Sequence, residues 1–201
     1  MPDSHARRYA GVGSRKLPAW AYAYLKQLAI ELGRRGYAAS TGDADGSDAA
    51  IFEGCIEAGT PVTVYAGRGK ASRPEGIRFA SFTPEQQARS LALAKQFHPN
   101  WTALSEDGRW LMPRNGFQVL GPDLDAPVNA LFCYAPGSRF EGDRLASVSG
   151  GTGQAVRLAY AHDIPAYNIA LSDHRTVIEQ RLGAPIAAAL GLDIAEQAPL
   201  F

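Results

Sequence analysis

Three short glycine-rich segments, each lying after a predicted strand and before or at a predicted helix, constrain the fold of this chain most. They occupy residues 11–15, 41–48 and 150–154. Glycine adopts backbone conformations that other residues avoid and lets the main chain come close to a ligand. The N–H groups at the start of a helix favour an anion. A nucleotide phosphate is therefore predicted at Thr152 to Gln154; the alternative is that the glycines serve tight turns alone.

Strands and helices alternate along the chain in the pattern of an α/β protein. The predicted strands are 8–12, 37–41, 61–65, 127–134 and 164–169. The predicted helices are 18–35, 49–58, 84–96, 116–120, 155–162 and 173–182, and 66–83 is predicted to be a loop. This alternation predicts a Rossmann-like, doubly wound, mostly parallel sheet with helices on both faces. No repeat or linker divides the chain, so residues 1–201 are expected to form a single domain.

The glycine-rich segments are expected to meet at one edge of this sheet. In open α/β sheets, ligands bind outside the carboxyl ends of the strands, where the strand order reverses. The convergence of three such segments is a stronger indication of a ligand site than any one of them.

Composition and charge argue against several classes of protein. Twenty basic and twenty acidic residues cancel, whereas proteins that bind duplex nucleic acid usually carry a basic excess. No apolar run approaches the roughly 20 residues that span a bilayer, and residues 1–10 lack the apolar core of a signal peptide. Cys55 and Cys133 are expected to be buried and reduced, as in a cytoplasmic protein.

No metal or cofactor is expected. Asp43, Asp45 and Asp48 resemble a calcium loop in their spacing, but Gly54 stands where such a loop requires a glutamate. No cluster of His and Cys residues suggests zinc. The apolar segment 184–201 is predicted to cover a sheet edge or to contact a second subunit, so a homo-oligomer is expected.

The glycine-rich segments also resemble those of the SLOG superfamily, which unites DNA-processing protein A (DprA) with the Lonely Guy phosphoribohydrolases. The matching residues are Gly11-Val12-Gly13-Ser14-Arg15, Thr41-Gly42, Gly46-Ser47-Asp48, Phe52-Glu53 and Gly150-Gly151-Thr152-Gly153. The compact DprA-like proteins of phages and bacteria are the most similar, and share His98-Pro99 with Trp101, Arg114-Asn115 and Gln118-Val119-Leu120-Gly121. The resemblance extends to about Asn168 and implies a Rossmann-like fold with a nucleotide or nucleotide-derived ligand.

The resemblance to the Lonely Guy enzymes implies roles for particular residues. Those enzymes use an arginine and a glutamate to cleave a nucleoside monophosphate at its N-glycosidic bond. Met112-Pro113-Arg114 is similar to their arginine element, so Arg114 is expected to hold the phosphate. Val156 stands in the place of the expected glutamate, and Asp48 or Glu53 is the alternative acid. Both acids also have structural alternatives: Asp48 as the N-cap of helix 49–58, and Glu53 facing solvent.

The sequence thus predicts a protein that binds a nucleotide at the strand ends and senses, sequesters or cleaves it. The predicted nucleotide-binding residues are Gly11, Gly13, Ser14, Arg15, Thr41, Gly42, Asp45, Asn115, Gln118, Gly150, Gly151, Thr152, Gly153 and Gln154. The alternative is single-stranded DNA binding of the DprA type, with Trp101, Trp110 or Tyr134 stacking on bases and the basic loop 68–78 on phosphates. The zero net charge does not favour nucleic acid as the partner.

Overall fold

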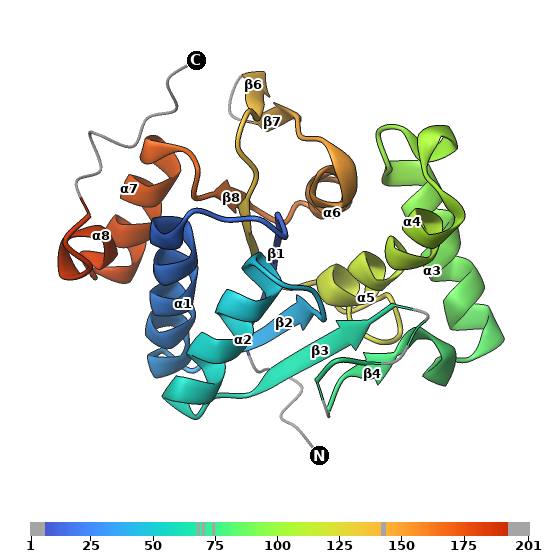
Figure 1. The fold of residues 1–201 in the computed structure, drawn as a ribbon, viewed down its shortest axis with the longest axis horizontal. Helices are drawn as coiled ribbons and strands as arrows, with labels where there is room; N and C mark the ends of the chain where they lie inside the picture. The colour runs from blue at the N-terminus through green and yellow to red at the C-terminus, as the bar shows by residue number, and fades with distance from the viewer. Residues whose placement is uncertain (1–6, 68, 70, 74, 142–143, 193–201) are drawn as a thin grey trace.

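The computed structural model describes residues 7–67, 69, 71–73, 75–141 and 144–192 (Figure 1). The first half of the chain forms β1 (Arg8–Gly13), α1 (Ala19–Arg34), β2 (Ala38–Gly42), α2 (Ser47–Ala58), β3 (Val62–Ala66), β4 (Ile77–Arg78), the 3₁₀ turn η1 (Phe79–Ser81) and α3 (Pro84–Phe97). The second half forms the turn η2 (Trp101–Ala103), α4 (Glu106–Leu111), α5 (Arg114–Leu120), β5 (Ala130–Tyr134), β6 (Arg139–Glu141), β7 (Arg144–Ser147), α6 (Gly150–Ala161), β8 (Ala166–Asn168), α7 (Ser172–Leu182) and α8 (Ile186–Ala189).

Six of the strands form one parallel sheet, in the order β4-β3-β2-β1-β5-β8. The chain begins at β1, in the interior of the sheet, and adds β2, β3 and β4 on one side. It then returns to place β5 and β8 on the other side of β1. The strand order therefore reverses between β1 and β5, where Gly13 pairs with Tyr134. The predicted Rossmann-like, doubly wound parallel sheet is confirmed.

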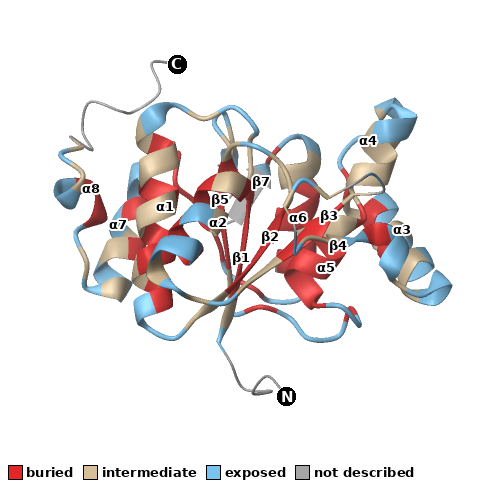
Figure 2. Ribbon diagram, turned by 60° about the horizontal axis from the view of Figure 1, so that its bottom comes forward, coloured by how far each residue is buried: buried red, intermediate tan, exposed pale blue. Residues whose placement is uncertain are grey.

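Helices cover both faces of the sheet. One apolar core joins the sheet to α5 and α6, with residues of α3 packed against it. The other joins the sheet to α1, α2, α7 and α8. Figure 2 shows buried residues along the strands and in part of α1, whereas α5 is buried almost throughout. In α1 the predicted apolar face is the buried one, comprising Leu25, Leu28, Ala29 and Leu32.

Several elements differ from the sequence-based expectations. The helix expected from residue 155 begins at Gly150, so the glycines form its first turn. The helix expected from residue 116 begins at Arg114, and the one expected from residue 49 begins at Ser47. The predicted loop 66–83 contains the two-residue strand β4, and the hairpin of β6 and β7 was not predicted. Short elements and glycine-rich helix starts lack the apolar periodicity on which such predictions depend.

The remaining expectations concern the cysteines, the tail and membranes. Cys55 and Cys133 are both buried and unpaired, as expected. In the apolar tail, the side chains of Ile186 and Ala187 are buried in the core that includes α1. Residues 193–201 lie outside the described part of the chain. No helix within the described residues has the length and apolar character needed to cross a membrane.

Candidate functional site

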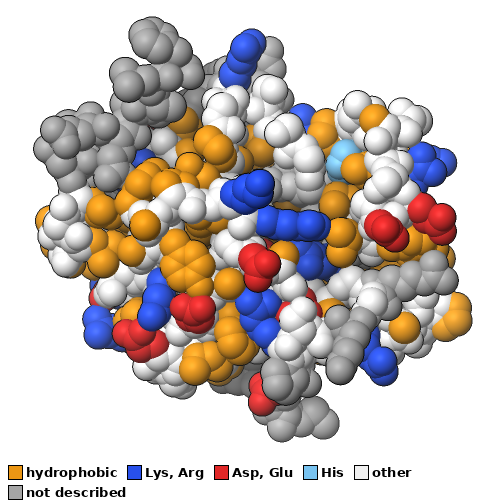
Figure 3. Space-filling view, viewed as in Figure 1, with side chains coloured by type: hydrophobic (Ala, Val, Ile, Leu, Met, Phe, Trp, Pro, Cys, Tyr) orange, Lys and Arg blue, Asp and Glu red, His pale blue; other side chains and the backbone are white. Residues whose placement is uncertain are grey.

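A pocket of about 370 Å³ lies at the point where the strand order reverses. Its walls come from the turn after β1, the turn after β5, the start of α2, helix α5 and the start of α6. In Figure 3 basic side chains gather near the middle of the face shown, with acidic side chains between them. Because the strand order reverses there, the pocket occupies the position at which doubly wound sheets bind their ligands.

The first turn of α6 forms one end of this pocket. Ser149, Gly150, Gly151 and Thr152 all line it. The N–H groups of a helix's first turn have no partner within the helix. In α6 the first hydrogen bond along the helix runs from the Gly153 N–H to the Ser149 carbonyl. Ser149 supplies no side-chain cap, and the first turn contains no acidic residue. The positive end of the helix dipole is thus unneutralised by the helix itself and suits an anion.

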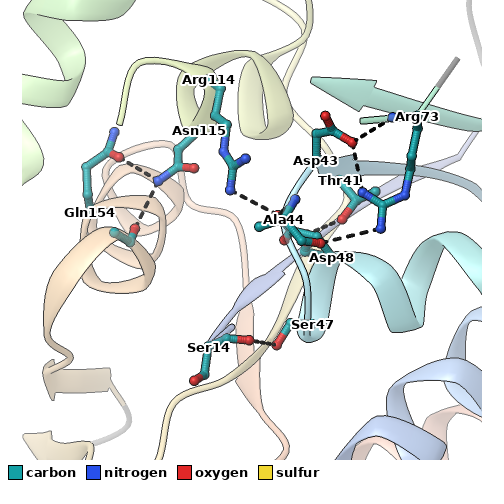
Figure 4. A network of polar contacts seen from close by, with 12 residues as sticks. Ser14, Thr41, Asp43, Ala44, Ser47, Asp48, Arg73, Arg114, Asn115 and Gln154 are labelled. Carbon is teal, nitrogen blue, oxygen red and sulfur yellow. Dashed lines mark hydrogen bonds and ion pairs between the residues drawn. The ribbon is translucent and has the colours of Figure 1, made fainter. Parts of the chain in front are cut away.

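Asn115 fixes the start of α6 against α5. Its Nδ2 donates to the Gly151 carbonyl at 3.0 Å and to Gln154 Oε1 at 2.7 Å (Figure 4). Gly153 completes this fit, because a Cβ there would collide with the Val148 carbonyl. Asn115 lines the pocket, whereas Gln154 and Gly153 are buried behind it. Gln154 and Gly153 were predicted to contact the ligand, but in the structure they hold the start of α6 in place and do not line the pocket.

A buried ion pair between Asp48 and Arg114 forms another wall. Arg114 Nη2 donates to Asp48 Oδ2 at 3.0 Å, and the side chains are 13% and 4% exposed respectively. The same oxygen accepts from the Ala44 N–H at 3.2 Å. Burial raises the pKa of Asp48 above its ordinary value, although Arg114 and the Ala44 N–H favour the ionised form. Asp48 lies in the first turn of α2 and is not its N-cap, which is Gly46.

Gly42 lets three pocket side chains come together at the end of β2. A Cβ on Gly42 would lie 2.6 Å from Gln118 Nε2 and 2.8 Å from Arg114 Cζ, and it would also collide with Asp48 Oδ2. Gln118 is almost fully buried, and neither of its amide atoms has a hydrogen-bond partner among the described residues. A glycine is therefore required here by crowding.

The turn after β1 is braced mainly by its own backbone and by α2. The Ser14 carbonyl accepts from the Ser47 N–H at 3.0 Å and from the Ser47 hydroxyl at 3.2 Å, and the Ser14 hydroxyl donates to the Lys16 carbonyl at 2.8 Å. Gly13 and Ser14 line the pocket, and Arg15 lines it as an exposed side chain. Arg15 has no ion-pair partner within the described part of the chain. It is thus the basic residue most available to an incoming anion.

Two predicted residues beneath the pocket serve the sheet. The Thr41 hydroxyl donates to the Gly11 carbonyl at 2.9 Å and so ties β2 to β1. Gly11 faces Ile51 so closely that a Cβ would lie 2.6 Å from its Cγ1 atom. Neither Thr41 nor Gly11 lines the pocket.

The structure does not bring every predicted residue to the pocket. Glu53 is exposed on α2, where it accepts a hydrogen bond from the Tyr22 hydroxyl. Burial of Tyr22 and this hydrogen bond raise the pKa of Tyr22 to about 12. Asp45 is exposed and does not line the pocket. Val156 is fully buried in the core and does not line the pocket.

The expectations for the basic loop 68–78 and for the stacking aromatic residues also change, because some of these side chains contact other residues of the chain. Arg73, expected to be available to a phosphate, donates to Asp43 at 2.9 Å and lies over the Phe52 ring. Arg68 and Lys70 of the same loop lie outside the described residues. Of the aromatic residues proposed to stack on a base, Tyr134 lines the pocket, whereas Trp110 packs against Phe79. No group of three or more metal-ligating side chains occurs in the described segments.

Some pocket residues were not singled out by the sequence reasoning. They are Leu111, Ala135, Pro136 and Ser149, whereas Val12 and Ala44 lie within the predicted segments 11–15 and 41–48. Ala135 and Pro136 directly follow β5, so the rule that ligands bind beyond the carboxyl ends of strands could have indicated them. The others contribute apolar surface or backbone, for which the sequence carries no specific signal.

Comparisons with known proteins gave no match in sequence and a distant similarity in structure. No protein-family model and no curated protein sequence matches this chain. A solved structure with a similar fold is the X-ray structure of DNA processing protein A from Streptococcus pneumoniae, with a TM-score of 0.46 and 15% sequence identity. The similarity covers 91% of this chain and 60% of that one, so this chain matches only part of that protein's length.

Proposed function

We propose that this protein binds a nucleotide in the pocket between β1 and β5, with a phosphate group at the N-terminus of α6. The observation that carries this proposal is the coincidence of two features. The pocket lies where the strand order reverses, and an unneutralised helix N-terminus opens into it. Doubly wound sheets hold nucleotide phosphates with this combination. We also propose membership of the SLOG superfamily, on the glycine-rich motifs that form these walls.

The other walls suit the uncharged part of a nucleotide. The Asp48 carboxylate and the Arg114 guanidinium bind each other, so this wall has little net charge. Arg114 is therefore assigned to holding Asp48, and the phosphate to α6 with Arg15 at the rim. The volume of about 370 Å³ falls within the range of about 300–1,000 Å³ that is common for small-molecule sites.

A second candidate function, cleavage of the N-glycosidic bond, is favoured by the position of Asp48. It is the carboxylate that lines the pocket, and its Oδ1 accepts no hydrogen bond from the described residues. A carboxylate at this place would stabilise positive charge that develops on the ribose as the base leaves. Release of free base from a nucleoside monophosphate, followed by chromatography, distinguishes cleavage from binding alone.

The substitution Thr152→Glu tests the phosphate position. Thr152 is the third residue of α6, where a glutamate interacts favourably with the helix dipole and adds about 0.3–1 kcal/mol to stability. The same negative charge repels a phosphate bound at the helix start. We expect the variant to fold with an unchanged or higher melting temperature and to bind ribose 5-phosphate and nucleoside monophosphates at least about tenfold more weakly, as measured by calorimetry.

The control is Gln180→Glu, which adds the same charge to the exposed last turn of α7 and should leave binding unchanged. Unaltered nucleotide binding by the Thr152→Glu protein would refute the proposed phosphate position. A single-stranded oligonucleotide included as a competitor tests the DNA-binding alternative. If that oligonucleotide binds tightly with a steep dependence on salt while mononucleotides do not bind, the protein binds DNA and the present proposal is wrong.

A further inference from the structure

Among the described residues, the amide of Gln118 stands out because it is buried with neither its donor nor its acceptor paired. Gln118 lies one turn after Arg114 on α5, lines the pocket and is 1% exposed. Both Nε2 and Oε1 lack hydrogen-bond partners among the described residues. A buried amide normally finds partners, because leaving its donor and acceptor unpaired is costly. The Gln118 amide lies in the wall of a pocket, so a ligand bound in that pocket can supply the missing hydrogen-bond partners.

The chemistry of the amide restricts what that partner is. A phosphate offers acceptors only and would satisfy Nε2 while leaving Oε1 unpaired. The adjoining Asp48–Arg114 pair adds no net charge that would attract an ion to this end of the pocket. An amide presents its donor and its acceptor side by side in one plane. Its best complement is a planar group that carries a neighbouring acceptor and donor, which is the edge of a nucleobase.

We propose that Gln118 is the residue that recognises the base of the bound nucleotide, by pairing its amide with a base edge that carries adjacent donor and acceptor groups. This inference rests on the proposed function, since it presumes that the phosphate lies at α6. A Cβ on Gly42 would lie within 3 Å of both Gln118 Nε2 and Arg114 Cζ, so the amide lies beside the Asp48–Arg114 pair in the pocket that all three side chains line.

The experiment compares ribose 5-phosphate with the four common ribonucleoside 5′-monophosphates, for the wild-type protein and for Gln118→Met. Methionine has a similar length and needs no hydrogen bonds. We expect at least one nucleotide to bind the wild-type protein about tenfold or more tightly than ribose 5-phosphate, as a bidentate contact provides. In Gln118→Met this preference disappears, while the affinity for ribose 5-phosphate stays the same. The ligand-free variant melts about 2–4 °C higher, because two unpaired buried atoms are removed.

Gln87→Met is the matched control. Gln87 lies on α3, outside the pocket, and its Nε2 donates to the Phe82 carbonyl at 2.7 Å. Its replacement should lower the melting temperature and leave every affinity unchanged. Gln118→Leu repeats the test should the methionine variant fold poorly.

The outcomes separate this inference from the function on which it rests. If ribose 5-phosphate and the nucleotides bind the wild-type protein equally, or if Gln118→Met and Gln118→Leu keep the preference for a nucleotide, Gln118 does not recognise the base and the phosphate site stands. If none of these ligands binds, the proposed function fails and this inference fails with it.

Discussion

At the scale of single residues, Asp48 shows two opposing effects on one carboxyl group. Burial disfavours the ionised form, whereas Arg114 and the Ala44 N–H favour it. Burial has the larger effect, so the pKa of Asp48 is raised. The folded protein therefore holds the Asp48 proton more tightly than the unfolded chain does. A carboxyl group of this kind is suited to a site where charge develops during a reaction, and it costs stability at neutral pH.

The substitution Asp48→Asn tests which effect dominates. Because the folded-state pKa is raised, the contribution of Asp48 to the free energy of unfolding is complete below its ordinary pKa of about 4 and is lost as pH rises through the raised value. Asparagine does not titrate. We therefore expect the stability of the wild type relative to Asp48→Asn to decrease as the pH rises above about 4, as measured by urea denaturation at each pH. A relative stability that increases with pH would show that Arg114 outweighs burial.

The sequence indicated Asp48 and Arg114 as site residues but not their bond to each other. Asp48 follows a glycine turn and Arg114 begins α5, so 66 positions separate them along the chain. Their contact depends on the packing of α5 across the end of β2. For the same reason Glu53, only five residues from Asp48, could not be excluded until the helix placed it on the solvent side beside Tyr22.

At the scale of elements, three helix starts contribute to the site. The starts of α2, α5 and α6 contribute Asp48, Arg114 and Gly150–Thr152 to the pocket. Each start lies two or more residues before the predicted one, because glycine and short polar residues carry no apolar periodicity. The start of α3 at Pro84 agrees with the predicted start, and the structure adds a capping box there between Thr83 and Gln86.

Gly42→Ala tests how closely these elements must approach. Gly42 lies in β2, so alanine is tolerated by the backbone, but its Cβ would collide with the side chains of Asp48, Gln118 and Arg114. We expect a loss of about 1–3 kcal/mol in the free energy of unfolding from this crowding, together with weaker nucleotide binding. Thermal and urea denaturation with calorimetric titration provide the measurements.

Gly69→Ala is the corresponding control, because a Cβ at Gly69 meets no atom of the described residues within 4 Å. This control should change stability by less than about 0.5 kcal/mol. Equal stability and binding for Gly42→Ala and the wild type would contradict the close packing described for this corner of the pocket.

At the scale of the whole molecule, strand order brings the site together. The alternation of strands and helices allowed the sheet type to be predicted, and with it the expectation that glycine-rich turns meet at one edge. The sequence could not supply the two-residue β4 or the hairpin of β6 and β7, because elements of that length carry little pattern of their own. The return of the chain from β4 to β5 creates the reversal beside β1, and the pocket lies at that reversal.

The central claim is that a nucleotide phosphate lies at the start of α6. The most direct test is a crystal structure of the protein with a nucleoside monophosphate bound. The phosphate oxygens are expected about 2.7–3.2 Å from main-chain N–H groups within Gly150–Thr152, with the base directed toward Gln118. A phosphate bound away from α6, or a nucleotide bound outside the pocket between β1 and β5, would contradict the claim.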